Sequence, residues 1–218
     1  MRNGLVGLAV VGAAAPLAVN RYQTALRTDA SHERSVANTD EMRMSDESVS
    51  AVWSELEEAQ ASEEAVRDEA IEQALERYSE YRLTRELAER IYDRALEAEV
   101  DPEIAFGLVR AESSFRNQST SVVGAIGLTQ LMPRTAAWLE PGVTRTQLRD
   151  PDTNLRIGFR YLKQLTDKYN DVDLALVAYN RGPGTVDRAL KRGQNPDNGY
   201  AAFVKGKANH GHKLFTSR

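Results

Sequence analysis

The chain has 218 residues, of which 41% are hydrophobic and 28% are charged, and none is a cysteine. This length suits one domain with extensions rather than two full enzyme domains, and the composition argues against pervasive disorder and against a protein with many membrane spans. Without cysteine the chain has no disulfide, no thiolate metal site and no cysteine nucleophile.

The net charge of −4 conceals two oppositely charged parts. Residues 51–100 carry 15 acidic and 6 basic side chains, whereas residues 101–218 carry 11 acidic and 17 basic ones. A basic C-terminal part favours an anionic polymer as partner, such as nucleic acid, an acidic membrane surface or a bacterial wall. Nucleic acid is the weakest of these three, because no nucleic-acid-binding motif accompanies the charge.

The first 50 residues are predicted to lie outside the folded core. Residues 1–20 contain an early positive charge and then an uncharged apolar run over residues 4–19, which is the layout of a secretory signal. Pro16 follows the small residues of the cleavage site and hinders cleavage, so this segment is either a signal peptide or an uncleaved membrane anchor. Residues 21–50 are rich in Ser, Thr, Asp, Glu and Arg and are predicted to form a flexible linker.

Residues 51–82 are predicted to form an acidic helical extension, because Glu, Ala, Arg and Gln dominate and apolar residues recur at mostly helical intervals. These apolar residues are Trp53, Leu56, Val66, Ile71, Leu75 and Tyr78. We interpret them as a stripe that rests on the neighbouring domain, since the heptads of a coiled coil do not persist.

Two further helix signals mark the start of the core. Apolar residues at i, i+4 and i+8 predict a helix over residues 84–98, with Thr84 as its N-cap. Asp101 and Pro102 predict the start of the next helix, because Asp caps free backbone amides and Pro fits the first helical position. The helical core is therefore predicted to begin near residue 84.

Glu112 lies on the second of these helices, four residues after Leu108 and eight after Ile104, so its carboxylate shares a face with two apolar side chains. Burial among apolar groups raises a carboxyl pKa, and the negative end of the helix dipole acts in the same direction. A raised pKa is what a general acid needs near neutral pH. Taken alone, however, a Glu near a helix end more often reaches solvent or forms an ion pair.

Two later segments combine small and polar residues. Gly124 and Gly127 allow close approach of a ligand or of another backbone segment, and Gln130 adds a hydrogen-bond donor and acceptor among apolar neighbours. Tyr179 and Asn180 end a predicted helix just before a Gly-Pro-Gly stop. An aromatic face beside an amide suits an acetylated sugar, but a buried Tyr beside a helix-terminating Asn explains the same pattern.

Together, these segments resemble the soluble lytic transglycosylase family, or SLT domain, whose fold is lysozyme-like. The matching motifs, in the family's order, are residues 111–115 (AESSF), 124–133 (GAIGLTQLMP), 150–151 (DP) with Asn154, Gly158, Tyr161 and Leu162, and 178–184 (AYNRGPG). The resemblance covers roughly residues 83–205 and implies an all-α catalytic domain there. The long acidic helix and the N-terminal hydrophobic segment precede this domain, and a basic tail over residues 206–218 follows it.

The sequence departs from the family pattern at several positions. Thr129 stands where the family commonly has Met, Asn117 where it often has Pro, and Arg181 where it often has Ala. The family usually places a Tyr soon after an acidic residue and a Thr, whereas here Tyr200 follows residues 196–199 (PDNG) with different spacing. These departures are peripheral to the predicted catalytic carboxylate, and no role is assigned to Tyr200.

The resemblance implies that Glu112 is the single catalytic acid and base of a peptidoglycan lytic transglycosylase. It would protonate the glycosidic oxygen between N-acetylmuramic acid and N-acetylglucosamine and then take the proton of the muramic 6-hydroxyl, which closes a 1,6-anhydro ring without water. Ser113 would help to position Glu112 or the N-acetyl group, and Gln130, Tyr179 and Asn180 would line the saccharide groove. No cofactor and no metal is implied.

Two alternatives stay open. A lysozyme-type muramidase would hydrolyse the same bond with water and would need a second carboxylate facing Glu112, for which Asp150, Asp171 and Asp173 are candidates. Asp150 is more simply explained as the cap of a helix that starts at Pro151. The other alternative is a noncatalytic wall-binding or assembly module that keeps the same fold.

The expected partner is the glycan strand of peptidoglycan, with membrane anchoring through residues 4–19 as a further expectation. A secretion apparatus and a virion are both candidate assemblies for such a catalytic unit. The expected location is outside the cytoplasm, in the periplasm or on a membrane facing the cell wall, and the alternative is association with a virion.

Overall fold

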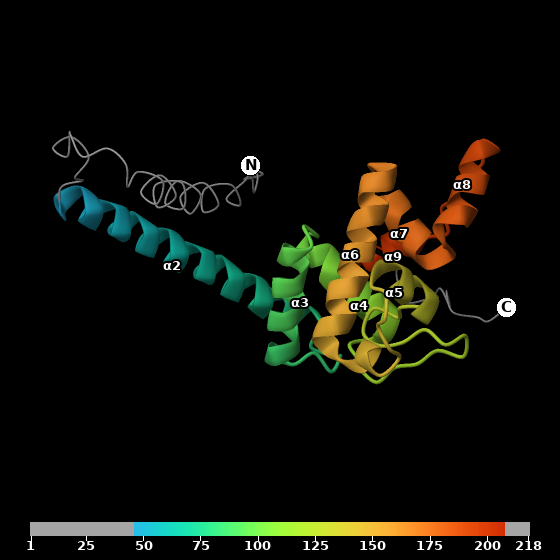
Figure 1. Cartoon of the computed structure of the whole chain (residues 1–218), viewed down its shortest axis with the longest axis horizontal. Coiled ribbons are helices and arrows are strands. Elements are labelled where there is room, and N and C mark those ends of the chain that lie inside the picture. Colours follow the sequence, from blue (N-terminus) through green and yellow to red (C-terminus); the bar gives the residue numbers. More distant parts are fainter. Residues whose placement is uncertain (1–45, 208–218) are drawn as a thin grey trace, which may run out of the picture. The chain divides into compact units, whose positions relative to one another are not determined.

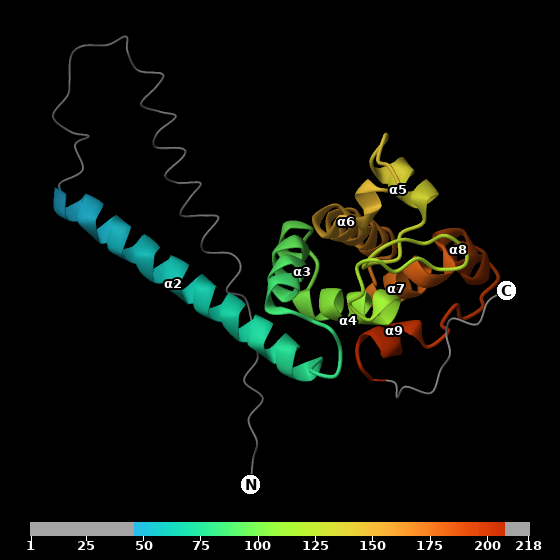
Figure 2. The same cartoon turned by 90° about the horizontal axis from the view of Figure 1, so that it is seen from below.

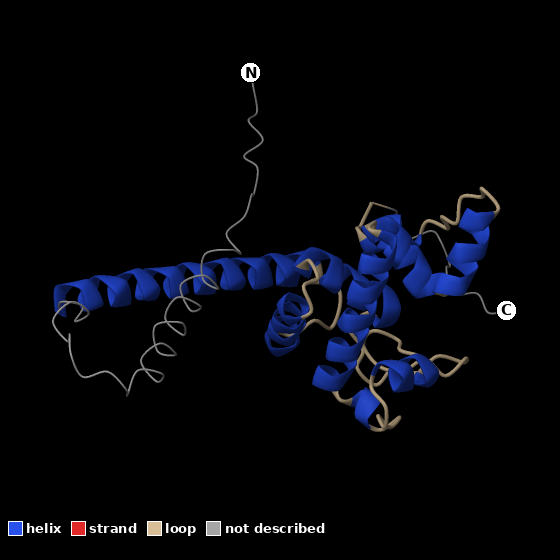
Figure 3. Cartoon of the chain, turned by 45° about the horizontal axis from the view of Figure 1, so that its top comes forward, coloured by secondary structure: helices blue, strands red, loops and turns tan. Residues whose placement is uncertain are grey.

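The computed structural model describes residues 46–207, and the regular secondary structure in this range is helical (Figures 1 and 3). The elements are α2 (Asp46–Arg77), α3 (Arg85–Glu97), α4 (Pro102–Ser113), α5 (Pro133–Leu139), the 3-10 helix η1 (Gln147–Arg149), α6 (Pro151–Tyr169), α7 (Val172–Arg181), α8 (Pro183–Lys191) and α9 (Tyr200–Val204). The predicted all-α class is therefore confirmed. The predictions for residues 1–45 and for residues 208–218 of the tail lie outside the described range.

The helix starts follow the capping residues that the sequence predicts. The Thr84 hydroxyl accepts a hydrogen bond from the backbone of Leu87 at 3.2 Å and opens α3. The Asp101 carboxylate accepts one from the backbone of Glu103 at 2.7 Å and opens α4, with Pro102 in the first turn. Each cap satisfies a backbone N–H that has no partner inside its helix.

Helix α2 begins at Asp46, earlier than the composition change at residue 51 indicates. The chain divides into two compact units, and the boundary falls inside α2, after Val66. In the first unit the side chains of Val52 and Trp53 are about half exposed, as is that of Val66. None of the helices in residues 46–207 is both long and apolar enough to span a membrane.

The last turns of α2 belong to the core of the second unit. Ile71 and Tyr78 are buried there, so the predicted apolar stripe is buried from residue 71 onward. The guanidinium of Arg67 also pairs with the carboxylate of Asp93 on α3, at 2.9 Å. This unit therefore begins before residue 83, because its core takes side chains from α2 as well.

Helix α4 lies at the centre of the second unit, between α3 and α9 (Figure 2). Its residues 105–111 are all buried, and a helix that is buried on every side is typical of the middle of a domain. Helix α6 packs against α3 and α7, and α7 packs in turn against α8 and α9. The fold thus surrounds the helix that carries Glu112.

The long loop between α4 and α5 is held by one buried amide, that of Asn154 on α6. Its Oδ1 accepts hydrogen bonds from the backbone N–H and the hydroxyl of Thr129, each at 2.8 Å. Its Nδ2 donates to the backbone carbonyls of Ile126 and Leu148, each at 2.9 Å. The amide therefore uses both its donors and its acceptor to join the loop, η1 and α6.

Two glycines make room for the amide of Asn154 and for the side chain of Thr129 that it bonds. A Cβ on Gly127 would lie 2.2 Å from Nδ2 of Asn154, and Gly127 has a φ of +80°, which disfavours any other residue. A Cβ on Gly158 would lie 2.4 Å from the hydroxyl oxygen of Thr129. The close approach predicted at Gly127 is confirmed, and the group that approaches is a side chain of the protein itself.

We expect Asn154→Ala to lower the free energy of unfolding by about 3 kcal/mol, because buried backbone groups of Thr129 and Leu148 lose their partner. Urea denaturation followed by circular dichroism measures the change. The control is Gln73→Ala, which removes an exposed amide bonded to Glu69 on α2 and should change stability by less than about 0.5 kcal/mol. Equal unfolding midpoints for the two variants would contradict the role given to Asn154.

Candidate active site

Glu112 lies in the last turn of α4, and its side chain is partly buried while a fraction stays open to solvent. Burial raises the pKa of its carboxyl to about 7, and a hydrogen bond from Tyr200 works in the opposite direction. The direction agrees with the sequence-based expectation, and desolvation is the largest cause. At neutral pH this group is therefore poised between the acid and the carboxylate.

Tyr200, the first residue of α9, donates its hydroxyl to Oε1 of Glu112. Its side chain is fully buried, and burial together with the charge of Glu112 raises the pKa of the phenol well above its usual value. The phenol therefore stays a neutral donor over the working pH range. The sequence assigned no role to Tyr200, and the signal that marks it is the Tyr that the family usually places in this region, here with different spacing from the preceding acidic residue.

The contact between α4 and α9 depends on two residues of α4. A Cβ on Gly107 would lie 2.2 Å from the carbonyl oxygen of Val204, so only glycine lets α9 come this close. Arg110 donates to the carbonyl of Phe203, and its guanidinium carbon lies 4.3 Å from the centre of the Phe203 ring. These contacts seat α9 so that its first residue reaches Glu112.

Tyr179 holds the loop between α4 and α5 close to Glu112. Its hydroxyl donates to the carbonyl of Thr129 at 2.9 Å, and its ring packs against that of Tyr161 with centres 5.2 Å apart. Burial, followed by the charge of Glu112, raises the pKa of this phenol. Tyr179 and Tyr200 are thus the two phenols that sense the charge of Glu112.

Gln130 and Ser113 use their polar atoms inside the protein. The Gln130 Nε2 donates to the carbonyls of Gly127 at 2.8 Å and Ser119 at 3.3 Å, which closes the loop on itself. The Ser113 hydroxyl is buried and donates to the carbonyl of Val109 at 3.1 Å, one turn back on α4. Within residues 46–207 the Ser113 hydroxyl has no hydrogen bond to Glu112, and its role in positioning Glu112 or the N-acetyl group stays a prediction.

Asn180 ends α7 beside Tyr179, as predicted. Its Oδ1 accepts a hydrogen bond from Nδ2 of Asn198 at 3.0 Å. Its own amide nitrogen donates no hydrogen bond to the described part of the chain. This nitrogen is therefore one polar atom of the predicted site residues that is free to bind a ligand, in addition to Oε2 of Glu112.

The three candidates for the second carboxylate of a lysozyme-type mechanism make contacts elsewhere. Asp150 caps α6 by accepting from the backbone of Thr153, and that bond lowers its pKa. Asp171 caps α7 at the end opposite Tyr179, about 12 Å away along the helix, and Asp173 pairs with Lys205. Among the described residues, no carboxylate shifts the pKa of Glu112.

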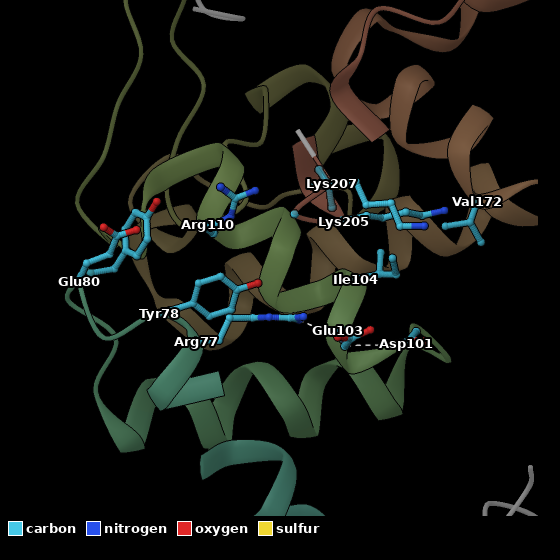
Figure 4. Close-up of a pocket in the computed structure, with 13 residues that line it drawn as sticks. Arg77, Tyr78, Glu80, Asp101, Glu103, Ile104, Arg110, Val172, Lys205 and Lys207 are labelled. Atoms are coloured by element: carbon cyan, nitrogen blue, oxygen red, sulfur yellow. Dashed lines mark hydrogen bonds and ion pairs between the residues drawn. The ribbon is translucent and has the colours of Figure 1, made fainter. Parts of the chain in front are cut away.

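A separate pocket of about 570 Å³ lies beside α4, on the side of Arg110 rather than Glu112. Figure 4 shows Tyr78 and Arg110 in its lining, with Arg77 extended toward Glu103. Arg110 and Glu112 are two residues apart and so point about 200° away from each other around the helix. The pocket therefore does not contain the candidate acid.

Residues 90–201, about half of the chain, match the family described as Transglycosylase SLT domain. The chain belongs to this family. The match includes every residue that the sequence predicted for the site, and it includes Tyr200 as well.

The chain is similar to several transglycosylases over part of its length. A transglycosylase of Enterobacteria phage PRD1 is 41% identical over 97 residues, which are 44% of this chain and 35% of that protein. The soluble lytic murein transglycosylase of Escherichia coli K12 is 38% identical over 95 residues, which are 40% of this chain and 15% of that protein. The structure of lytic transglycosylase Slt from Pseudomonas aeruginosa is 32% identical with a TM-score of 0.46, over 53% of this chain and 21% of that one. The chain thus spans about a third of the phage relative and less of the other two.

We expect Glu112→Gln to stabilise the protein at pH 8 but to have little effect at pH 4. Between the usual carboxyl pKa of 4.5 and the folded value of about 7, the unfolded chain loses the proton while the folded protein keeps it. Stability therefore falls as pH rises through this window, by on the order of 3 kcal/mol, and the Glu112→Gln variant, which does not titrate, does not lose this stability. Thermal unfolding of both proteins from pH 4 to 8 measures it, and parallel curves would contradict the raised pKa.

Proposed function

We propose that this protein is a peptidoglycan lytic transglycosylase that cleaves the β-1,4 bond between N-acetylmuramic acid and N-acetylglucosamine and leaves a 1,6-anhydro-muramic end. The observation that carries the proposal is the setting of Glu112. This carboxyl has a pKa of about 7, accepts a hydrogen bond from Tyr200, and has no second carboxylate acting on it within residues 46–207. Membership of the SLT family supports the same reaction.

In the first step protonated Glu112 donates its proton to the glycosidic oxygen. The bond between that oxygen and the anomeric carbon of the muramic sugar breaks, and the N-acetylglucosamine side leaves with the proton. Because Oε1 accepts the hydrogen bond from Tyr200, Oε2 is the oxygen that transfers the proton. The same hydrogen bond stabilises the carboxylate that the step leaves behind.

In the second step the carboxylate of Glu112 removes the proton of the muramic 6-hydroxyl. The 6-oxygen bonds to the anomeric carbon and closes the anhydro ring, so Glu112 is protonated again and no water is consumed. A pKa near 7 serves both steps, since a group that must give and take a proton works best near the ambient pH. The muramic N-acetyl oxygen is our candidate for stabilising the anomeric carbon between the steps, which removes the need for a second carboxylate.

The other predicted site residues divide into two roles in this proposal. Asn180 contacts the sugar directly, through the amide nitrogen that Asn198 leaves free. Tyr179 and Gln130 act by holding the loop that follows α4, to which both donate hydrogen bonds. Ser113 packs inside α4 and supports the turn that carries the catalytic carboxyl.

We further propose that residues 83–205 form the catalytic domain, supported by the last turns of α2. In this proposal residues 1–20 act as a signal peptide or membrane anchor, residues 21–50 as a linker whose residues 46–50 belong to α2, residues 51–82 as an acidic extension and residues 206–218 as a basic tail. The protein would then act on the wall from outside the cytoplasm. Its relatives are named as phage, soluble and membrane-bound transglycosylases, which supports this proposal.

We expect Glu112→Gln to lower the rate of wall lysis by about 100-fold or more, the usual contribution of a general acid and base. The substrate is purified peptidoglycan, and mass spectrometry of the released fragments reports the chemistry. The wild-type protein should release 1,6-anhydro-muropeptides.

Three other results would overturn the proposal. Fragments that all carry reducing ends would establish a lysozyme-type hydrolase. Unchanged lysis by Glu112→Gln, with the variant folded as judged by circular dichroism, would remove this carboxyl from the chemistry. No release of fragments by the wild-type protein, together with binding to the sedimented wall, would identify a noncatalytic wall-binding module.

A further inference from the structure

The segment that delivers Tyr200 to Glu112 has no regular secondary structure. Residues 192–199 connect α8 to α9, and most of their side chains are exposed. Helix α9, which follows, has only five residues. A loop and a short helix of this kind have little intrinsic stability, so the position of Tyr200 depends on contacts with other elements.

Two hydrogen bonds join this loop to the end of α7. Arg181 donates from Nη1 to the carbonyl of Pro196 at 2.6 Å. One residue earlier on α7, the Asn180 Oδ1 accepts from Nδ2 of Asn198 at 3.0 Å. The two bonds enter the loop two residues apart, and both lie within four residues of Tyr200.

The bond from Arg181 satisfies a backbone group that is hidden from water. Pro196 is buried, whereas its neighbours Asn195 and Asp197 are exposed. A carbonyl at a buried position costs free energy when it has no donor, and a guanidinium gives a stronger hydrogen bond than a neutral group does. The bond therefore holds the loop down at its one buried residue.

Asn198, two residues after Pro196, connects the loop to Tyr200. While its Nδ2 donates to Asn180, its Oδ1 accepts from the backbone N–H of Tyr200 at 3.3 Å. Gly199 between them has a φ of +80°, which glycine adopts without strain. The chain of contacts thus runs from the end of α7 through the loop to the residue that bonds Glu112.

We propose that Arg181 is a positioning residue, which holds the loop between α8 and α9 in place so that Tyr200 meets Glu112. Arg181 does not touch the reacting atoms in this proposal, and its effect reaches them through Tyr200. The inference rests on the proposed function for its catalytic consequence, but its structural claim concerns only the geometry of Tyr200 and Glu112.

The contacts of α9 with α4 lie near the C-terminal end of α9, which explains why a second restraint is needed near its N-terminal end. Arg110 and Gly107 seat α9 against α4 near its C-terminal end, at Phe203 and Val204. Tyr200 lies at the other end of this short helix. Arg181, together with Asn180, therefore restrains the side of α9 that these two contacts with α4 do not reach.

Loss of the restraint from Arg181 should change the pKa of Glu112. The hydrogen bond from Tyr200 lowers the pKa of that carboxyl, so a Tyr200 that leaves part of the time lets the pKa rise above about 7. The groups coupled to Glu112 are Tyr200 on α9 and Tyr179 on α7, and Arg110 acts on Tyr200 from α4. None of these groups is altered by a change at Arg181.

The experiment compares Arg181→Ala and Arg181→Lys in the full chain, with Arg188→Ala as the matched control. Arg188 is an exposed arginine on α8 that bonds the hydroxyl of Thr185 within its own helix, at 3.2 Å. We expect Arg181→Ala to lower kcat about fivefold with KM nearly unchanged, because one hydrogen bond is lost away from the substrate. Lys keeps a donor that can reach the carbonyl, so Arg181→Lys should restore part of kcat, and Arg188→Ala should match the wild type.

A second readout needs no activity. In protein labelled with ¹³C at the glutamate carboxyls, the signal of Glu112 is identified by its absence in Glu112→Gln and is followed from pH 4 to 9. Arg181→Ala and Tyr200→Phe should both raise the pKa of Glu112, with the larger rise in Tyr200→Phe. This titration distinguishes failure of the positioning role from failure of the proposed function, since it reports the geometry even if the protein cleaves nothing.

The double variant gives the decisive comparison. If Arg181 acts through Tyr200, then Arg181→Ala should have almost no further effect on kcat or on the pKa in the Tyr200→Phe background. Equal effects in both backgrounds would overturn the proposal, as would an unshifted pKa in Arg181→Ala. A rise in KM with kcat unchanged would also overturn it, because that result would place Arg181 in contact with the substrate instead.

Discussion

The hydrogen bond from Tyr200 to Glu112 is the interaction on which the rest of this structure converges. It joins two side chains that are 88 positions apart in the sequence, one at the end of α4 and one at the start of α9. The bond forms because Gly107 lets α9 lie directly on α4 and because Arg110 fixes the far end of α9. Burial and this hydrogen bond pull the pKa of Glu112 in opposite directions, and their balance near 7 is the property that the proposed chemistry uses.

A second network holds the loop that runs past the acid. The buried amide of Asn154 and the hydroxyl of Tyr179 both bond Thr129. The amide of Asn154 on α6 accepts from the Thr129 hydroxyl, and the Tyr179 hydroxyl on α7 donates to the Thr129 backbone carbonyl. Tyr179 and Gln130, which in the sequence suit a sugar ligand, thus use their polar groups to hold the loop between α4 and α5. Because a buried polar group is costly when unsatisfied, these hydrogen bonds stabilise the position of the loop.

The contacts of the other candidate carboxylates favour a reaction with one carboxylate. Asp150 and Asp171 cap helices, and Asp173 forms an ion pair, so none of them is available opposite Glu112. A hydrolase of the two-carboxylate kind needs a base to activate water on the far side of the sugar. Where that base is missing among the described residues, a hydroxyl of the substrate itself is the simplest nucleophile.

The sequence by itself determined the helical class, the capped starts of α3, α4 and α6, and the direction of the pKa shift at Glu112. Caps join residues two or three positions apart, and the apolar face around Glu112 follows from helical spacing, so both are local properties. Only the tertiary structure decided that Tyr200 is the partner of Glu112 and that Asn154 and Tyr179 hold the loop between α4 and α5. These contacts depend on how helices distant in sequence pack together, and helical spacing carries no information about that arrangement.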